Sequence, residues 1–401
     1  MDTIAVKPST IRIRERCDEL TRTAVLEDGC AQWVGAEVRG NDERWEVVHA
    51  PIDASLYSGT AGIAAVLSRV DADRYGELSR WAARQAVAGW HRLPADGAFA
   101  GRAGAALAVS RVGARLGDTQ LVAASLAALE QLAPHRSESL AGDLIVGAAG
   151  TVLALSAAIA DGAAWLTHDA VALGDLVVGA ARRTPAGLSW AEPGEDALCG
   201  LAHGASGAAL ALVELWSVTR HDRFAEAALD AVRFERAWFE EVGVWPDLRH
   251  PHATRAEARE HAASMWCHGA VGCGLVRLRM AELLDDDACR AEAGAAVRQA
   301  VADAQRAFAS GRGAARGLTV CHGLGGTVDL LMEAARVLRE PAHAEAAELL
   351  VTMAIDEIGA DEWPSGVNGG GWAPGVMQGV AGEIAVLHRV SGESDSPSWW
   401  P

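Results

Sequence analysis

The sequence has little of what membrane-spanning, secreted and nucleic-acid-binding proteins require. It contains no apolar run of about 18 residues, the length that a membrane-spanning helix needs, and residues 1–4 do not resemble the start of a signal peptide. Lys7 is the only lysine among 401 residues, and the formal net charge is −18. Nucleic acids and anionic membranes attract basic surfaces. We therefore expect a cytoplasmic protein that binds no nucleic acid and has no membrane span.

Cysteine is also scarce. Seven cysteines are an odd number in a long chain without a secretion signal. This pattern favours reduced thiols or metal ligands over a disulfide framework. Half of the residues are hydrophobic, so the chain can bury a sizeable core.

A short unit, Gly-x-x-Gly followed by an apolar run, occurs seven times. The apolar runs do not alternate with period two, which argues against strands, and the intervals of 42 to 65 residues each hold two helices with their connections. The first glycines of the copies are Gly59, Gly101, Gly147, Gly204, Gly269, Gly323 and Gly379. Small residues three positions apart allow the starts of inner helices to pack closely around an axis. The repeats therefore predict an all-α fold built from seven helical hairpins.

The repeats also predict the domain organisation. Copies spread over most of the chain leave no room for a second core, so we expect one domain over residues 51–392. An N-terminal segment over residues 1–50 should contain a helix near residues 11–26 and a short strand or extended arm near residues 45–49. Residues 393–401 are expected to form a disordered tail.

Three consecutive copies carry a histidine directly before the first glycine, namely His203, His268 and His322. Cys267 and Cys321 precede the last two of these histidines. Equivalent positions of neighbouring repeats lie side by side in a closed ring, so these side chains should converge at one mouth. Two thiolates and one imidazole form a zinc ligand set that leaves a fourth position open. Helix N-termini also lower thiol pKa values, which favours metal binding.

This ligand set favours a particular chemistry. A zinc ion with two thiolates and a neutral imidazole has a formal charge near zero, so it suits a substrate thiolate whose sulfur stays nucleophilic. Hydrolytic zinc prefers histidine and carboxylate ligands, and no His-Glu-x-x-His motif occurs. The pattern therefore indicates thiol alkylation or addition. Asp143, the single acid in the apolar stretch before the third copy, is by itself typical of a helix cap.

The motifs resemble the lanthionine synthetase C-like family, the lanthipeptide cyclases, over roughly residues 50–390. The residues that carry the resemblance are the seven glycine pairs with His203-Gly204, Trp266-Cys267-His268-Gly269 and Cys321-His322-Gly323. Leu56-Tyr57 and Pro374-Gly375-Val376-Met377 look especially like the cyclase domain of bifunctional type-2 synthetases. The resemblance implies an α/α toroid of seven inner and seven outer helices.

The resemblance also implies an activity. Zn²⁺ on Cys267, Cys321 and His322 would serve the addition of peptide cysteine thiols to dehydroalanine or dehydrobutyrine, which forms thioether rings. His203, paired with Asp143, would act as general acid or base. His268 takes the place of a Tyr or His that follows the first ligand, and it would donate to the enolate.

Two further features bear on this resemblance. Some family members carry an arginine shortly before the Trp-Cys pair, where this chain has residues 261–265 and Arg259 lies further back. The chain contains no dehydratase portion, so a separate dehydratase, a kinase or lyase protein, would have to supply the dehydrated precursor peptide.

Two alternatives stay open. A zinc-bearing toroidal binding module would hold a thiol or a modified peptide without closing rings, and it would tolerate the loss of Asp143 or His203. A toroidal enzyme of another class is the second alternative. A carbohydrate enzyme would need two facing carboxylates, for which Asp143 and Asp53 are the candidates. A zinc prenyltransferase subunit would need an aromatic, basic pocket, which a chain with 5% aromatic residues does not favour.

Overall fold

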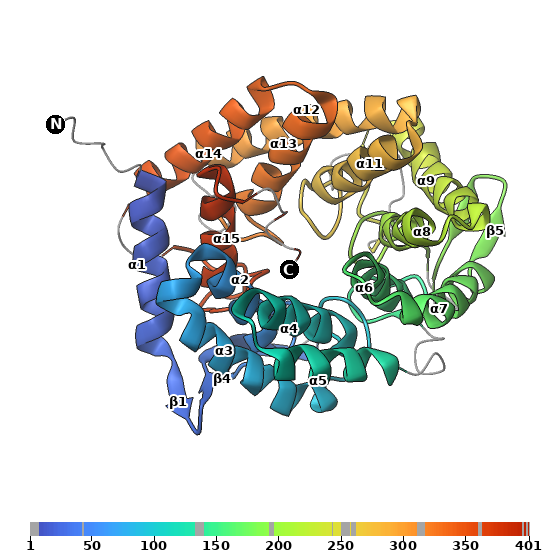
Figure 1. Cartoon of the computed structure of the whole chain (residues 1–401). Coiled ribbons are helices and arrows are strands. Elements are labelled where there is room, and N and C mark those ends of the chain that lie inside the picture. Colours follow the sequence, from blue (N-terminus) through green and yellow to red (C-terminus); the bar gives the residue numbers. More distant parts are fainter. Residues whose placement is uncertain are drawn as a thin grey trace.

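The structure is a computed structural model of the chain. It describes residues 8–41, 44–132, 140–191, 196–242, 244–249, 257, 262–310, 317–359, 363–394, 397 and 400. These residues form a ring of helices in two layers, with one layer around the axis and the other outside it (Figure 1). The predicted all-α toroid is confirmed.

Each inner helix begins directly after the first glycine of one sequence copy, which is its N-cap residue. The inner helices are α2 (Thr60–Val70), α4 (Arg102–Leu116), α6 (Ala148–Ala160), α8 (Ala205–Thr219), α11 (Ala270–Leu284), α13 (Leu324–Leu338) and α15 (Val380–Val390). Most of their residues are buried. These apolar, alanine-rich helices therefore form the core of the ring.

Six outer helices follow their inner partners in the chain and pack against them. They are α3 (Ala72–Gly89), α5 (Thr119–Glu130), α7 (Thr167–Gly179), α9 (Asp222–Val242), α12 (Asp287–Ser310) and α14 (Ala342–Ile358). The seventh outer position is taken by α1 (Pro8–Thr23), which packs on α15. An early helix thus covers the last inner helix and completes the outer layer. None of the helices in the described ranges is both long and apolar enough for a membrane span.

The second glycine of each pair makes room for the loop that precedes its own helix. A Cβ atom on Gly104 would collide with the carbonyl of Ala98, and one on Gly272 would collide with the carbonyl of Trp266. The Cβ on Gly272 would also press on Leu201 of the neighbouring repeat. The repeated glycine pairs therefore allow close packing within and between repeats.

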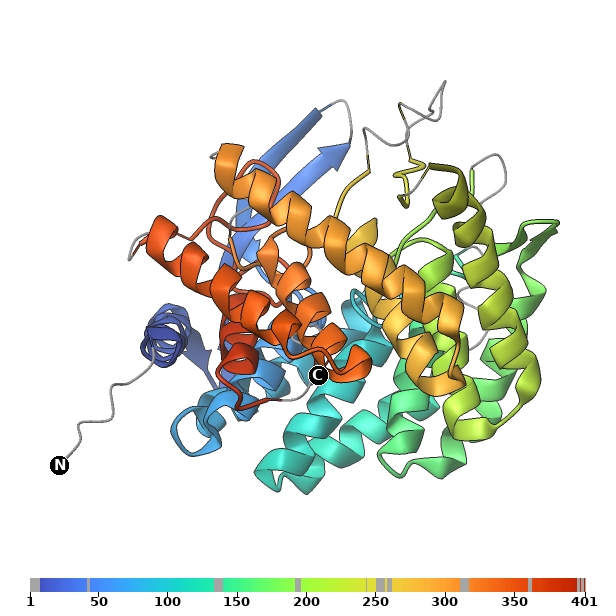
Figure 2. The ribbon, with the colours of Figure 1, turned by 90° about the horizontal axis from the view of Figure 1, so that it is seen from above.

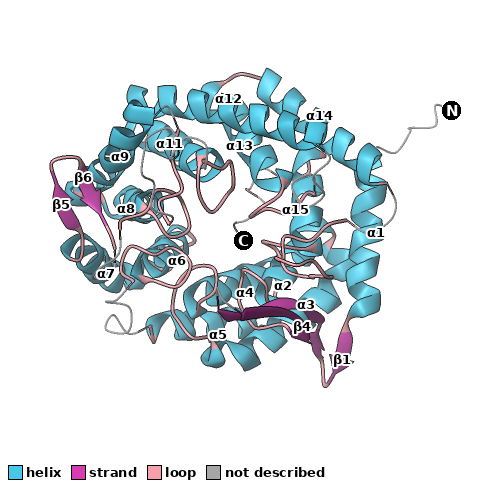
Figure 3. Cartoon of the chain, turned by 180° about the vertical axis from the view of Figure 1, so that it is seen from behind, coloured by secondary structure: helices cyan, strands magenta, loops and turns pink. Residues whose placement is uncertain are grey.

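The loops before the inner helices are joined by a closed belt of backbone hydrogen bonds. In each bond the N–H of one loop donates to a carbonyl of the next loop around the ring, and the last loop returns to the first. The donor and acceptor pairs are Tyr57 to Phe99 (2.9 Å), Ala98 to Leu144 (3.2 Å), Leu144 to Ala202 (3.0 Å), Ala202 to Cys267 (2.9 Å), Trp266 to Cys321 (3.1 Å), Cys321 to Met377 (2.8 Å) and Met377 to Tyr57 (3.0 Å). The belt holds equivalent positions of neighbouring repeats side by side. Figure 3 shows such loops gathered around the centre of the ring.

The described residues also form three antiparallel hairpins outside the helices. They are β1 (Val25–Glu27) with β2 (Cys30–Gln32), β3 (Val34–Asn41) with β4 (Arg44–Pro51), and β5 (Arg182–Thr184) with β6 (Gly187–Ser189). Short 3-10 segments occur at η1 (Trp90–Arg92) and η3 (Ala164–Leu166). The extended piece expected at residues 45–49 lies within β4. Figure 2 shows the β3–β4 hairpin standing out from one end of the ring.

The tail expected to be disordered, residues 393–401, falls partly outside the described residues. Within it, Pro397 and Trp400 line a cavity near the axis of the ring.

Candidate functional site

The loops that precede the inner helices surround a cavity of about 260 Å³ at one mouth of the ring. Its lining includes Tyr57, His203, Asp247, Arg249, Cys267, His268, Cys321 and His322, together with the buried thiol of Cys199. The structure thus brings together the cysteines and histidines that the repeat register placed at equivalent positions. Asp143 reaches the same group through His203.

Cys267, Cys321 and His322 form a cluster of possible metal ligands. One donor atom from each residue lies within 4.8 Å of the other two. Cys321 is buried, and the other two are half-buried. The backbone belt explains the proximity of the sulfurs, because the two cysteines hold the same position in adjacent loops.

The orientation of His322 fits a ligand role. Its Nδ1 lies 3.1 Å from the carbonyl oxygen of Gly366, in the glycine-rich loop before the seventh copy. The Nδ1–H therefore donates to this carbonyl, which leaves Nε2 as the ring nitrogen on the side of the cysteines. Metal-binding histidines are commonly fixed in this way by an outer hydrogen bond.

The surroundings change the pKa values of the two thiols in opposite directions. A hydrogen bond from Cys321 lowers the pKa of the Cys267 thiol against the effect of burial, and contacts with His268 and His322 lower it further. The hydrogen bond to Cys267 raises the pKa of Cys321, and burial raises it further. These contacts therefore favour the thiolate form of Cys267, and a bound cation would favour the loss of the proton from both thiols.

His203 and Asp143 form a close pair across two neighbouring loops. The Nδ1 atom of His203 lies 2.6 Å from Oδ2 of Asp143. Burial opposes the charged ring, but the hydrogen bond and the charge of Asp143 outweigh it and raise the pKa of His203. Asp143 Oδ1 also accepts hydrogen bonds from the backbone N–H groups of Ile145 (2.8 Å) and Val146 (2.9 Å). Asp143 therefore structures its own loop and orients the imidazole.

A buried carboxylate supports the loop that carries His203. Glu235 Oε1, from α9, accepts hydrogen bonds from the N–H groups of Gly200 and Ser206, each at 2.8 Å. The fully buried Arg277 donates to Glu235 Oε2 at 3.0 Å and to Ser206 Oγ at 2.9 Å. One acid thus binds the loop on both sides of His203. No repeat pattern marks Glu235 in the sequence.

Arg249 and Asp247 are site residues that the sequence reasoning missed. They belong to residues 244–249, after α9, and Arg249 donates to Asp247 Oδ2 at 2.5 Å. Burial raises the pKa of Asp247, but the hydrogen bonds from Arg249 outweigh it and lower the pKa to about 2. Arg249 thus places a cation at the mouth from a segment well before residues 261–265. His261 and Arg259 lie outside the described residues.

Two further side chains complete the lining. His268 lies between Cys267 and Asp247, with Nδ1 3.1 Å from Cys267 Sγ and Nε2 3.4 Å from Asp247 Oδ2. Its ring therefore contacts the thiol directly. Tyr57 is the second of these side chains. Burial raises its pKa well above the usual value, and the nearby Cys321 raises it further, so the hydroxyl stays protonated. The sequence reasoning noted Tyr57 only as part of the resemblance.

Comparisons with known proteins agree with this architecture. A model of the lanthionine synthetase C-like protein family matches residues 50–401. The solved structure of a nisin cyclase superposes with a TM-score of 0.62 at 16% identity, over 97% of this chain and 94% of that one.

Two further solved structures show weaker similarity. A family 76 glycoside hydrolase from a bovine Bacteroides thetaiotaomicron strain has a TM-score of 0.49 at 10% identity, over 97% of this chain and 78% of that one. A possible member of the GH105 family from Klebsiella pneumoniae subsp. pneumoniae MGH 78578 has a TM-score of 0.47 at 13% identity, over 98% of this chain and 94% of that one. No curated protein sequence matches the chain.

Proposed function

The chain belongs to the lanthionine synthetase C-like family, and from this premise we propose that it is a lanthipeptide cyclase. Its substrate would be a dehydrated, ribosomally made precursor peptide. The reaction adds a cysteine thiolate of that peptide to a dehydroalanine or dehydrobutyrine and forms a (methyl)lanthionine ring. The observation that carries the proposal is the meeting of three soft donors with a His–Asp pair around one cavity.

Cys267, Cys321 and His322 would hold Zn²⁺. The chemistry of the donors fits this ion, because two sulfurs and an imidazole with its other nitrogen already engaged are typical zinc ligands. When bound, Zn²⁺ would supply a binding position for the substrate sulfur and lower the pKa of its thiol. The cavity beside the three donors leaves this position accessible.

His203 would move the protons of the reaction. The thiol loses its proton, its sulfur bonds to the β-carbon, and the double-bond electron pair shifts to form an enolate that takes up a proton at the α-carbon. One proton is released and one is consumed, so a single imidazole can act as base and then as acid. Asp143 keeps Nδ1 engaged and favours the protonated ring, which leaves Nε2 to exchange the proton.

Arg249 would stabilise the enolate. Its guanidinium lines the same cavity as His203 and the cysteines, and Asp247 orients it. A fixed positive group placed where negative charge develops lowers the barrier of such additions. His268, in contact with the Cys267 sulfur, would tune the thiolate or donate to the enolate as the resemblance implies.

The proposal includes a cytoplasmic setting and a separate dehydratase, a kinase or lyase protein. Dehydroalanine and dehydrobutyrine arise from serine and threonine by loss of water. The residues assigned above serve addition to a double bond, so the elimination that creates it is assigned to the partner.

The test is metal content together with ring closure on a dehydrated peptide that contains cysteine. We expect about one zinc per chain and a loss of peptide thiols, measured by alkylation and mass spectrometry. Cys321→Ala should abolish both, whereas Cys30→Ala, at a half-exposed thiol on β2, should change neither. Zinc without ring closure would favour the binding-module alternative, and absence of zinc after anaerobic reconstitution would refute the mechanism.

A further inference from the structure

A groove of about 1130 Å³ opens beside the candidate functional site. The groove is continuous with the cavity of that site, because the two share four lining residues, namely Asp247, Arg249, His268 and His322. Pockets for small molecules hold roughly 300–1,000 Å³. The groove therefore has room for a larger ligand that reaches the site, such as a peptide segment.

One wall of the groove is rich in glycine. It begins at Gly366, whose carbonyl accepts the Nδ1–H of His322. It continues through Gly369, Gly370 and Gly371, whose φ angles of 87°, 84° and 105° favour glycine. A Cβ atom on Gly370 would meet no atom within 4 Å. Since glycines allow another backbone to approach closely, an extended peptide can pack along this wall.

The β3–β4 hairpin supports the glycine-rich wall. The N–H of Ala36 in β3 donates to the carbonyl of Trp372 at 2.7 Å. A Cβ atom on Gly369 would collide with Val47 of β4, and one on Gly371 would collide with Ala36. None of the described hairpin residues lines the groove. The hairpin therefore holds the wall in place without filling the groove.

Where the groove meets α1, two carboxylates share one guanidinium. Arg16 donates to Glu19 Oε2 at 2.6 Å, and its other terminal nitrogen lies 2.9 Å from Glu383 Oε2. Arg12, on the same helix, pairs with Glu15 at 3.0 Å. Burial raises the pKa of Glu383 to about 7, although Arg16 opposes this shift. When both carboxyls are ionised, Glu19 and Glu383 together exceed Arg16 by one negative charge.

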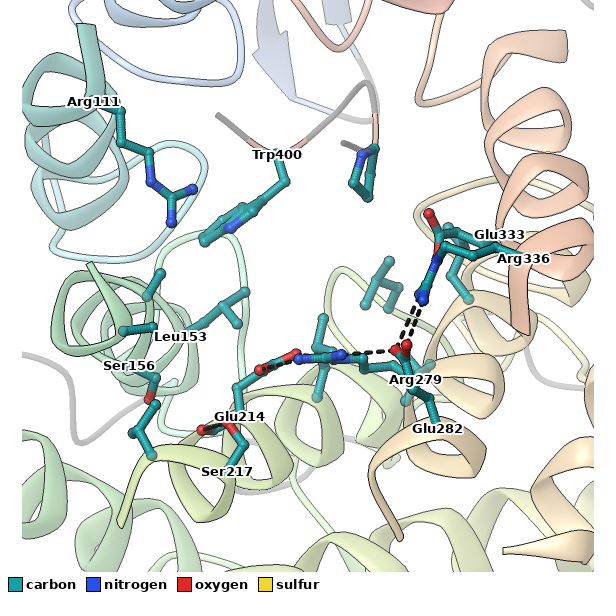
Figure 4. Close-up of a pocket in the computed structure, with 18 residues that line it drawn as sticks. Arg111, Leu153, Ser156, Glu214, Ser217, Arg279, Glu282, Glu333, Arg336 and Trp400 are labelled. Carbon is teal, nitrogen blue, oxygen red and sulfur yellow. Dashed lines mark hydrogen bonds and ion pairs between the residues drawn. The ribbon is translucent and has the colours of Figure 1, made fainter. Parts of the chain in front are cut away.

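The cavity toward the other ends of the inner helices differs in its charge (Figure 4). Its lining holds three arginines and three glutamates, namely Arg111, Arg279, Arg336, Glu214, Glu282 and Glu333. The lining of the groove holds two arginines and three acids, namely Arg16, Arg249, Glu19, Asp247 and Glu383. Opposite charges are thus equal in number in the far cavity, whereas the groove has an excess negative charge. The groove therefore favours a ligand with a positive charge.

We propose that the groove binds the substrate peptide in extended form and takes a basic side chain of that peptide beside Glu19 and Glu383. The peptide backbone lies along the glycine-rich wall, between this side chain and the cysteine that reacts. The inference rests on the proposed function, because that function supplies the peptide. It adds a preference for lysine or arginine near the reacting cysteine.

The test measures peptide binding to the full-length protein, after addition of zinc, by fluorescence anisotropy. The probes are fluorescein-labelled peptides of glycine and alanine that contain one cysteine and one lysine, with the lysine at each position in turn. Matched probes carry norleucine or glutamate in place of the lysine. At pH 8, above the pKa of Glu383, the best lysine probe should bind about fivefold more tightly than its norleucine counterpart. The glutamate probe should bind most weakly.

Glu383→Gln and Glu19→Gln should each remove most of the lysine preference. The matched control is Glu15→Gln, which makes the same charge change on α1 at a side chain that is 55% exposed and does not line the groove. The preference should persist in this control. If Glu383→Gln protein does not fold, Glu19→Gln decides, because that side chain is partly exposed. Equal affinity of the parent for the lysine and glutamate probes would overturn the proposal, as would a lysine preference that persists in folded Glu19→Gln protein.

The binding measurement is separate from the test of the proposed function, because it needs no ring closure. Ring closure on a dehydrated peptide without a lysine preference would overturn this inference and leave the proposed function standing. A lysine preference without ring closure would support the groove and count against the cyclase.

Discussion

The two ends of the inner helices carry opposite chemistry. At the N-terminal ends, carboxylates accept backbone N–H groups: Asp53 from Ser55, Asp143 from Ile145, and Glu235 from Gly200. At the C-terminal ends, arginines gather in the last turns: Arg69 in α2, Arg115 in α4, Arg336 in α13 and Arg389 in α15. Helix dipoles favour anions at the first end and cations at the second. Because the inner helices run parallel around the ring, anions are favoured at one mouth and cations at the other.

This difference separates two tasks. The N-terminal loops place thiols, imidazoles and an acid around a cavity. From the middle of the inner helices to their C-terminal ends, ion pairs join neighbouring helices, namely Glu214–Arg279, Glu282–Arg336 and Asp329–Arg389. The residues of the candidate site thus lie at one end of the inner helices, and the ion pairs that stabilise their packing lie away from it. Substitutions should therefore affect activity at one end and stability at the other.

The largest effect is expected on stability, at the ion pairs between the inner helices. Asp329→Asn removes a fully buried carboxylate that lies 2.5 Å from Arg389 and leaves this arginine with Glu333 as its charged partner. We expect a loss of about 3 kcal/mol in the free energy of unfolding. The matched control is Glu282→Gln, in a pair that is partly exposed to solvent, where the loss should stay below about 1 kcal/mol. Chemical denaturation measures both. A loss of metal from folded Asp329→Asn protein would contradict the view that these ion pairs affect stability and not the candidate site.

The next effect belongs to the catalytic end. His203→Asn should slow ring closure about 100-fold, because a general acid and base is lost, while the zinc content stays at the parent value. Thiol alkylation of the peptide over time measures the rate. An unchanged rate would remove His203 from the mechanism and would favour a binding role for the site.

A smaller effect is expected for Arg249→Ala. The guanidinium is 48% exposed, so solvent screens part of its field, and we expect about a tenfold lower kcat rather than the larger losses seen at enclosed sites. Arg39→Ala, in an exposed pair with Glu37 on the β3–β4 hairpin, is the control and should leave kcat unchanged. If both variants lost activity equally, the effect would be a general one of charge and not of position.

The smallest effect is a pH dependence of stability. Against the opposing effect of burial, Asp143 raises the pKa of His203, so the charged pair stabilises the fold fully below the unfolded pKa of about 6.5. This contribution is lost as the pH rises through the higher folded pKa. Asp143→Asn should therefore lower the melting temperature more at pH 5.5 than at pH 9. A difference that grows with pH would contradict the assigned direction.

Much of the fold was readable from the sequence, because it is encoded in the repeats. All seven glycines identified as repeat starts cap inner helices. The same register placed Cys267, Cys321 and His322 next to one another. A repeat carries this information because equivalent positions must occupy equivalent places once the ring closes.

The tertiary structure alone decided the rest. It placed α1 over α15, brought Arg249 to the mouth and Glu235 against the loop that carries His203, and placed Trp400 in the wall of a cavity near the axis of the ring. These residues lie outside the repeat motif, and the segments against which they pack are not their neighbours in the chain. No local period marks such contacts, since they form only when separate segments of the chain pack together. The sequence by itself determined the ring and its ligand set, and ring closure determined what surrounds them.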